Sequence, residues 1–250
     1  TFAVDDARFE GETSFNDSEF GTTHFIDAAF EGELDVSYTT FEKRATFEGT
    51  RFGEAVDAAE VRFESDACFA ETEFEATVSF RGTEFKGGAH TVDDADFKAA
   101  RFGSTADFQL VEFRHANFGS VTFEGNAMFR ESLFTDKGEF QNSRFGASAV
   151  FSRAVFVDRA DFSSCEFHDE AHFDELQFRK DTSFADAVFA ADATFRATEF
   201  EGSANMHNDD ASFENARFEG TTDFDKATFL YAHFAGTTIT GRERFTSVDF

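Results

Sequence analysis

The sequence has no proline and no tryptophan, and only two cysteines, two methionines and two tyrosines among its 250 residues. Two cysteines without a CxxC spacing exclude the dense disulfide framework of a small secreted scaffold. No stretch approaches the roughly 18 consecutive apolar residues of a membrane-spanning helix. Basic residues are scarce as well, because 22 Lys and Arg stand against 50 Asp and Glu, a formal charge of −28. Direct nucleic-acid binding, which needs clusters of Lys and Arg, is therefore not expected.

Phenylalanine, in contrast, is abundant and regularly spaced. The chain has 41 Phe, whereas a disordered acidic chain would be poor in aromatic residues. From Phe9 to Phe250 the series advances in steps of five or six, with one step of seven from Met206 to Phe213, which defines 45 positions, 40 of them Phe. The other five positions are Val36, Ala58, Thr91, Met206 and Ile239. Only Phe2 lies outside the series, and a period of this kind indicates a repeat protein.

A second feature repeats together with the Phe series, because the residue two positions earlier is small in nearly every unit. Ala106 precedes Phe108 in this way, whereas Leu176 and Glu243 are the clearest exceptions. The intervening positions are mostly Asp, Glu, Arg, Thr, Gly and Ser. A helix would place apolar residues every 3.6 residues and an ordinary strand every second residue over longer runs. The pattern instead predicts a chain that turns a corner every five or six residues.

This pattern resembles that of the pentapeptide-repeat proteins, whose unit is small–polar–(Leu or Phe)–x–x, in a Phe-centred form that covers essentially the whole chain. The resemblance implies an all-β fold, a right-handed quadrilateral β-helix with the Phe and the small residue pointing inward. The alternation of five and six gives about 22 residues per four-sided coil, and hence about 11 coils. Coils stacked at about 4.8 Å would bring Phe rings to the 4.5–7 Å at which aromatic pairs attract. We expect one solenoid domain over residues 1–250.

Acidic residues gather in the two stretches where the period lengthens, but their spacing is not that of a metal site. These residues are Asp93, Asp94, His207, Asp209 and Asp210. Calcium needs six to eight oxygen ligands, often on a loop that contains glycine, and no DxDxDG spacing is present. We expect them to be solvated loop residues.

Histidines and cysteines do not form a catalytic constellation either. His168 and His172 are four residues apart, which would suit a zinc pair on a helix but not on the sides of a coil. Cys165 takes an inward position and should be inert, whereas Cys68 directly precedes Phe69 at an outward position and should be an exposed thiol. We therefore predict that the protein is not an enzyme and has no catalytic residues, no cofactor and no metal site.

One group of apolar residues is a candidate interaction surface. The position before each Phe should point outward and is usually polar, yet Met128, Leu133, Val150 and Val155 occupy it. Met128 and Val150 are 22 residues apart, as are Leu133 and Val155, so each pair should stack on successive coils. An exposed apolar patch of this kind marks interfaces, although a chance cluster on a polar rod is the alternative.

The acidic charge supports two hypotheses of function. The first, which we favour, is a non-enzymatic structural or protein-interaction solenoid with a salt-adapted surface. Only six of the 22 basic residues are Lys, an acid-rich, Lys-poor composition like that of proteins from salt-loving organisms. The second follows from the resemblance, because one group of pentapeptide-repeat proteins mimics DNA in shape and charge and occupies a topoisomerase, gyrase. That group tends to carry a dimerising C-terminal element, whereas the repeat here continues to Phe250.

The two ends of the sequence are still in repeat, with Phe2 near one end and Phe250 at the other. Solenoids need polar caps, because a terminal coil otherwise exposes its core and unpaired strand edges. We therefore expect the chain to be part of a longer protein or assembly, with a protein partner or self-association through uncapped ends. The compartment stays open between the cytoplasm and the cell surface of a high-salt organism.

Overall fold

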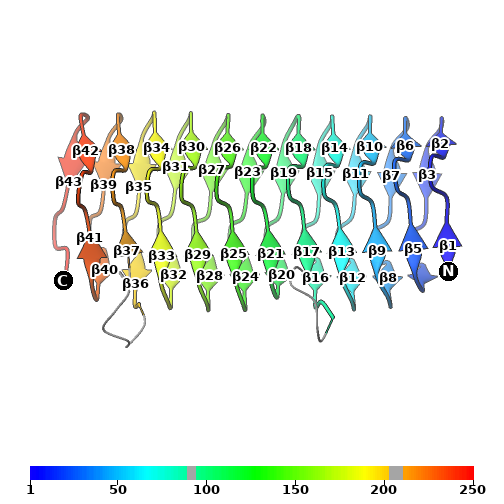
Figure 1. Ribbon diagram of the computed structural model, residues 1–250, viewed down its shortest axis with the longest axis horizontal. Coiled ribbons are helices and arrows are strands. Elements are labelled where there is room, and N and C mark those ends of the chain that lie inside the picture. Colours follow the sequence, from blue (N-terminus) through cyan, green and yellow to red (C-terminus); the bar gives the residue numbers. More distant parts are fainter. Residues whose placement is uncertain (89–93, 203–210) are drawn as a thin grey trace.

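The computed structural model describes residues 1–88, 94–202 and 211–250, which form a straight β-solenoid with the two termini at opposite ends (Figure 1). Every regular element in these ranges is a strand of two residues, and the 43 strands pair in parallel into four sheets. Successive strands occupy sheets A, B, C and D in turn. Ten complete coils of four strands are therefore followed by three strands of an eleventh, which confirms the predicted all-β quadrilateral solenoid.

The strands of each sheet follow one another along the rod in sequence order. Sheet A contains β1 (Phe2–Ala3), β5 (Thr23–His24), β9 (Ala45–Thr46), β13 (Ala67–Cys68), β17 (Ala95–Asp96), β21 (Ala116–Asn117), β25 (Gly138–Glu139), β29 (Ala160–Asp161), β33 (Thr182–Ser183), β37 (Ala211–Ser212) and β41 (Ala232–His233). Sheet B contains β2 (Arg8–Phe9), β6 (Ala29–Phe30), β10 (Arg51–Phe52), β14 (Glu73–Phe74), β18 (Arg101–Phe102), β22 (Thr122–Phe123), β26 (Arg144–Phe145), β30 (Glu166–Phe167), β34 (Val188–Phe189), β38 (Arg217–Phe218) and β42 (Thr238–Ile239). Sheet C contains β3 (Thr13–Ser14), β7 (Leu34–Asp35), β11 (Val56–Asp57), β15 (Val78–Ser79), β19 (Ala106–Asp107), β23 (Ala127–Met128), β27 (Ala149–Val150), β31 (Ala171–His172), β35 (Ala193–Thr194), β39 (Thr222–Asp223) and β43 (Glu243–Arg244). Sheet D contains β4 (Glu19–Phe20), β8 (Thr40–Phe41), β12 (Arg62–Phe63), β16 (Glu84–Phe85), β20 (Glu112–Phe113), β24 (Leu133–Phe134), β28 (Val155–Phe156), β32 (Gln177–Phe178), β36 (Glu199–Phe200) and β40 (Thr228–Phe229).

The interior is filled by ladders of stacked Phe rings. Phe129 stacks on Phe151 of the next coil with ring centroids 4.8 Å apart and planes 1° from parallel. It also meets Phe140, of the adjacent ladder, edge to face at 5.4 Å and 89°. Burial of one such side chain stabilises the fold by about 1.5–3 kcal/mol, and a favourable ring pair adds about 0.5–1.5 kcal/mol. The Phe series of the sequence is therefore the core.

The small residue two positions before each Phe also faces inward, and its hydroxyl or thiol often bonds the preceding coil. The Thr72 hydroxyl donates to the Phe47 carbonyl at 2.9 Å, and the Ser143 hydroxyl donates to the Phe118 carbonyl at 2.5 Å. Buried polar groups need such partners. Thr, Ser and Cys can therefore replace Ala at this position with their polar group satisfied, with the exception of Thr222, whose buried hydroxyl has no partner among the described residues.

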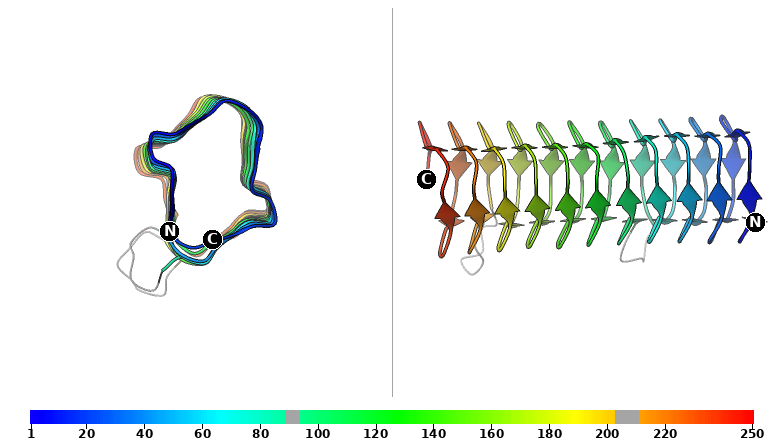
Figure 2. Two further views of the ribbon diagram at one scale, coloured as in Figure 1. Left: turned by 90° about the vertical axis from the view of Figure 1, so that its right-hand side faces the viewer. Right: turned by 90° about the horizontal axis from the view of Figure 1, so that it is seen from above.

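The five- and six-residue steps belong to different corners of the coil. Seen along the rod, the coils lie over one another in a four-sided outline (Figure 2). Every A–B and every C–D corner takes five residues, and every B–C corner takes six. At each A–B and C–D corner the residue two positions after the core residue has a φ between 51° and 71°. The amide of the following residue donates a hydrogen bond back to the carbonyl of the core residue, as from Val121 to Phe118 at 3.4 Å. The positive φ and this hydrogen bond define a type II turn.

The D–A corner is the variable one, with five or six residues in most coils. Between Phe85 and Phe97 it takes 12 residues, and between Phe200 and Phe213 it takes 13. Thr91 and Met206, which the period predicts as core positions, lie outside the described residues.

The first coil also differs from the prediction. Phe2 pairs with Thr23, which places Phe2 at a small-residue position and Val4 at the first core position. The Phe2 ring lies 5.5 Å from that of Phe20 and 5.6 Å from that of Phe25. Phe2 therefore belongs to the core of the first coil, although it lies outside the five-and-six series.

Candidate interaction surface

The four apolar residues singled out from the sequence stack as predicted, but on two sides of the rod. Met128 pairs with Val150 in sheet C, and Leu133 pairs with Val155 in sheet D. All four side chains are half-buried. Since sheets C and D meet at the C–D corner, the two pairs flank this corner in the sixth and seventh coils.

Charged residues occupy the corner between the two pairs. Glu131 forms ion pairs with Arg130 at 3.3 Å and with Arg153 at 3.5 Å. Arg153 forms a second ion pair with Glu175 of the next coil at 3.0 Å. The hydrogen bond to Glu175, followed by its charge, raises the pKa of Arg153. Exposed pairs of this kind contribute little to stability. The surface therefore consists of two apolar strips with a ridge of paired charges between them.

In four other coils of sheet C an outward Asp holds the turn that follows it. The Asp107 carboxylate accepts a bond from the amide of Gln109 at 2.9 Å, and Asp35, Asp57 and Asp223 bond the amide two residues ahead in the same way. An Asp or Asn that bonds its own backbone two residues on is a common device for starting a turn.

The same device occurs on sheet A. Asn117 accepts from the amide of Gly119 at 3.0 Å, and Asp161 accepts from that of Ser163 at 2.9 Å. Met128 and Val150 have no side-chain oxygen that could do this for the turns that follow them. The apolar strip on sheet C therefore replaces a stabilising turn bond.

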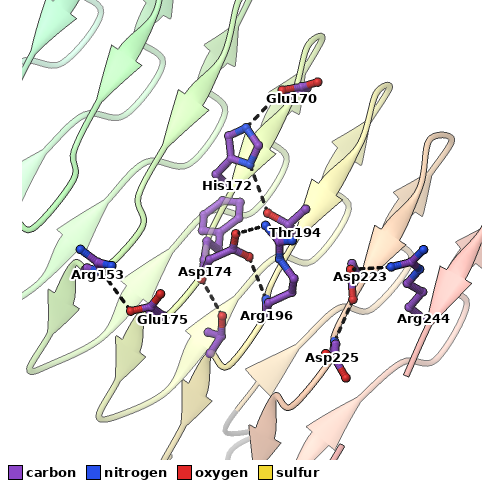
Figure 3. A network of polar contacts seen from close by, with 12 residues as sticks. Arg153, Glu170, His172, Asp174, Glu175, Thr194, Arg196, Asp223, Asp225 and Arg244 are labelled. Atoms are coloured by element: carbon purple, nitrogen blue, oxygen red, sulfur yellow. Dashed lines mark hydrogen bonds and ion pairs between the residues drawn. The ribbon is translucent and has the colours of Figure 1, made fainter. Parts of the chain in front are cut away.

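Beyond the apolar strip the same side carries a polar network, shown in Figure 3. His172 contacts Thr194 of the next coil at 3.2 Å and Glu170 at 3.3 Å through its two ring nitrogens. Asp174 accepts from the Arg196 guanidinium at 2.7 Å and from its backbone amide at 2.9 Å. Burial alone would raise the pKa of Asp174, but the bonds from Arg196 outweigh it and lower that pKa.

Two residues that the sequence reasoning missed lie on the same corner. Tyr38 is 64% exposed and Leu110 is 48% exposed. Both occupy the turn position with positive φ, at 58° and 59°, where a bulky side chain is disfavoured by about 1–2 kcal/mol. The sequence could have shown them, because both are large apolar residues two positions after a core residue, whereas only the position before the core residue was searched for apolar side chains.

The corner just described is called the C–D edge, and its counterpart the A–B edge. The turn residues of the C–D edge are Asp17, Tyr38, Glu60, Gly82, Leu110, Glu131, Arg153, Glu175, Ala197, Lys226 and Ser247. Those of the A–B edge are Asp6, Asp27, Gly49, Glu71, Ala99, Ser120, Asn142, Ser164, Asp186, Asn215 and Gly236. The A–B edge has no apolar residue larger than alanine at this position.

The cysteines are both buried and free. The prediction of an exposed thiol at Cys68 is wrong, because Cys68 is only 8% exposed. It does lie at an outward position, paired with Thr46 and Asp96, but the neighbouring coils cover it. Burial raises the pKa of the Cys68 thiol and, more strongly, that of Cys165.

The residues considered for metal binding do not come together where the structure describes them. His168 contacts Glu166 at 3.1 Å, on a different side from His172. Asp94 is buried and lies 3.7 Å from the Arg114 guanidinium, whereas Asp93, His207, Asp209 and Asp210 lie outside the described residues. Among the described residues no group of three His, Cys, Asp or Glu is arranged to hold a metal ion.

The comparisons with known proteins identify the repeat. The family model "Pentapeptide repeats (9 copies)" matches residues 140–188. These residues are therefore similar to pentapeptide repeats. The 49 matched residues contain the same ladders, turns and pairing as the other described coils, so the same four-sided β-helix runs along the rod.

No curated protein sequence matches the chain. Among solved structures, the chain is similar to QnrB1, described as a plasmid-mediated fluoroquinolone resistance protein, with 12% identity and a TM-score of 0.28 over 92% of this chain and 90% of that one. A likeness this low says nothing of this chain's function. In the described part of the chain, no helix has the length and apolar character needed to cross a membrane.

Proposed function

We propose that this pentapeptide-repeat solenoid is a non-enzymatic interaction module that binds a protein partner through Met128, Leu133, Val150 and Val155. The observation that carries the proposal is the replacement of the turn-holding Asp on sheet C. In the preceding coil Asp107 holds its turn, whereas Met128 and Val150 present apolar side chains at the same place. Since an Asp there would hold the turn, as it does in four other coils of sheet C, we attribute the apolar pair to a requirement outside the fold.

The proposal is tested by comparing two forms of the protein as bait in an extract of the cells that contain it. In the variant form, Met128→Asn and Val150→Asn introduce a turn acceptor on sheet C. Leu133→Thr and Val155→Thr replace the apolar side chains on sheet D with a polar, β-branched one that suits a strand. A partner retained by the native protein and lost by the variant is the expected result. Equal retention by both forms would contradict the proposal, provided that both have the same β-type circular dichroism.

We also propose that the acidic surface is an adaptation to high salt. The charge of −28 makes the rod repel itself, and such repulsion destabilises a compact state. The Debye length falls from about 30 Å at 0.01 M to about 3 Å at 1 M salt, so the melting temperature should rise toward molar NaCl and equally toward molar KCl. A melting temperature that is flat between low and molar salt would contradict the adaptation.

Not all of the acidity is available for such a role. Asp35, Asp57, Asp107 and Asp223 on sheet C are turn acceptors, as are Asp96 and Asp161 on sheet A. These carboxylates have a structural reason to be present whatever the medium.

A DNA mimic that binds gyrase is the alternative function, and the observation that favours it is the charge of −28 along a straight rod. It predicts inhibition of gyrase supercoiling by the native protein at matched salt. The turn-holding acids allow a sharper version of this assay, because Asp→Asn at these positions removes charge and keeps the turn bond, as Asn117 does. Inhibition that falls in step with the charge would support the mimic.

Self-association through the ends is a further part of the proposal. Phe245 and Phe250 are 41% and 76% exposed, and they stack on Phe224 and Phe229 at 5.1 and 5.5 Å. The face of each ring away from its ladder would gain from contact with the first coil of a second copy. Light scattering should show oligomers that disappear when a charged helical cap is appended after Phe250. A strictly monomeric rod at high concentration would count against this part.

A further inference from the structure

The sides of the rod offer a partner side chains rather than backbone. Hydrogen bonds of the four sheets run along the rod axis from coil to coil, as from the Phe129 amide to the Val150 carbonyl at 2.7 Å and from the Leu133 amide to the Val111 carbonyl at 2.9 Å. A peptide that adds a strand needs an unpaired sheet edge, and among the described strands each sheet is paired continuously from its first strand to its last, which leaves such edges at the ends. A partner on the side of the rod must therefore dock through its own side chains, as an α-helix does.

Apolar groups on the C–D edge extend beyond the four-residue surface in one direction. Leu110 lies in the coil next to Met128, and its amide bonds the Arg130 carbonyl of that coil at 3.1 Å. Tyr38 lies three coils further toward the N-terminus on the same edge. It lines a surface depression of about 230 Å³, together with Thr40, Glu60, Arg62, Gly82 and Glu84. Gly82 is the turn residue of the fourth coil, one coil before Leu110. It has no side chain, and this leaves the depression open.

The apolar row is interrupted at the turn positions by Glu60 and Gly82 and by the Glu131–Arg153 ion pair, but its overall length fits a helix. Tyr38 lies in the second coil and Val155 in the seventh, so the row extends over about 24 Å at the usual strand spacing. An α-helix covers this distance with about 16 residues.

The charge beside the row is negative. Glu112 lies directly next to Leu133 in sheet D, and Glu60 and Glu84 border the depression. The nearby basic residues are engaged, since Arg62 pairs with Glu84 at 3.8 Å and Arg81 pairs with Asp107 at 4.0 Å. A partner with basic residues on both sides of an apolar stripe is therefore complementary to this edge.

We propose that the C–D edge binds an amphipathic α-helix that has an apolar stripe flanked by Lys or Arg, with Tyr38 and Leu110 extending the contact made by Met128, Leu133, Val150 and Val155. This inference rests on the proposed interaction function and specifies its partner. The apolar stripe lies along the row from Tyr38 to Val155, and the basic flanks lie against Glu60 and Glu112, because Glu84 already pairs with Arg62 and Lys86.

The probe for the test is a peptide of about 18 residues made of Leu and Lys, with all Leu on one helical face. A scrambled peptide of the same composition has the same charge but no stripe. The edge variant carries Tyr38→Asn, Leu110→Asn, Met128→Asn and Val150→Asn. The matched control carries Ala99→Asn and Ser120→Asn, which lie at the same turn positions on the A–B edge. None of these changes alters the charge, and Asn tolerates positive φ.

The native protein and the control variant should bind the striped peptide roughly tenfold or more tightly than the scrambled one, because a few buried anchor residues carry most binding energy. The edge variant should bind both peptides alike. Equal binding of the two peptides by the native protein, or undiminished binding of the striped peptide by the edge variant, would overturn the inference. Thermal unfolding of each form verifies that the variants are folded.

The two proposals can fail separately. If a native partner is lost from the four-residue variant described above but the striped peptide does not bind, the interaction surface stands and its helical partner does not. If the striped peptide binds the C–D edge but native retention does not depend on Met128 and its neighbours, the interaction function is wrong.

Discussion

Along the A–B edge and the C–D edge the chain makes the same five-residue corner in every coil, with the turn residue at positive φ. Beneath both edges lie equivalent ladders of buried Phe, such as Phe162 in sheet A and Phe173 in sheet C. The side chains that face solvent differ. Tyr38 and Leu110 occur on one edge only, and the apolar Met128 and Val150 replace turn acceptors on the same side.

The comparison separates what the fold requires from what it tolerates. A turn residue such as Asn142 or Gly49 on the A–B edge suits positive φ. Since the C–D edge folds through the same turn, the fold does not require Tyr38 or Leu110. The apolar character of the C–D edge is the feature on which the proposed docking surface rests.

The largest expected effect tests whether the two edges share one core. Phe162→Ala and Phe173→Ala should each lower the free energy of unfolding by about 3–5 kcal/mol. Both rings are fully buried and stack on both neighbours, Phe162 at 4.8 and 5.0 Å and Phe173 at 5.2 and 4.9 Å. Denaturant unfolding at fixed salt measures the two losses. A near-zero loss for both would contradict the ladder as the source of stability, and a large difference would show that the two sides have unequal cores.

The second effect concerns the turn acceptors that Met128 and Val150 lack. Asp107→Ala should cost about 0.5–1.5 kcal/mol, because the Gln109 amide loses its bond. Asn117→Ala should cost about the same on sheet A, where it frees the Gly119 amide. Asp107→Asn is the control, and it should be nearly neutral. If Asp107→Asn cost as much as Asp107→Ala, the charge of the carboxylate and not its turn bond would be the stabilising feature.

The third effect is a gain in stability. Leu110→Asn should stabilise the protein by about 0.5–1 kcal/mol, because it relieves a bulky side chain at positive φ and buries no less of the core. Ala99→Asn on the A–B edge should give a smaller gain, since alanine is the smaller side chain there. Melting temperatures at matched salt provide the comparison. A loss of stability on Leu110→Asn would mean that Leu110 belongs to the fold and not to a docking surface.

The smallest effect depends on pH. The pKa of Asp174 is lowered in the folded protein, so its contribution is present above its unfolded pKa of about 3.9 and is lost as pH falls through the folded pKa. Arg196→Gln should raise the pKa of Asp174 and lower stability by less than about 1 kcal/mol at neutral pH, with no loss in acid. Carboxyl NMR titration measures the pKa directly. An unchanged pKa would show that Arg196 does not hold it low.

Much of the fold was predictable because one side chain dominates the interior. Forty Phe at steps of five or six leave few alternatives to a four-sided coil, and the structure confirms it. The error arose where the series was started too late, because Val4, five residues before Phe9, takes its first core position. Thr91 and Met206 lie outside the described residues.

The surface was less predictable, because outward direction does not determine exposure. Cys68 points outward and is nonetheless only 8% exposed, because it lies between the larger side chains of Thr46 and Asp96 on the neighbouring coils. Met128 and Val150 were found because they interrupt a polar pattern. Tyr38 and Leu110 were missed because their position belongs to a turn whose geometry becomes evident only when the five-residue corners are separated from the six-residue ones.

The central claim is that a helix docks along one edge of the rod, and its location can be measured by photo-crosslinking. A Leu and Lys helix that carries a photoreactive group within its apolar stripe is bound to the native protein, irradiated, and mapped by mass spectrometry. The account predicts crosslinks to the C–D edge between Tyr38 and Val155, and few to the A–B edge at the same coils. Crosslinks spread evenly over the four sides would show that charge alone attracts the helix, and would contradict the account.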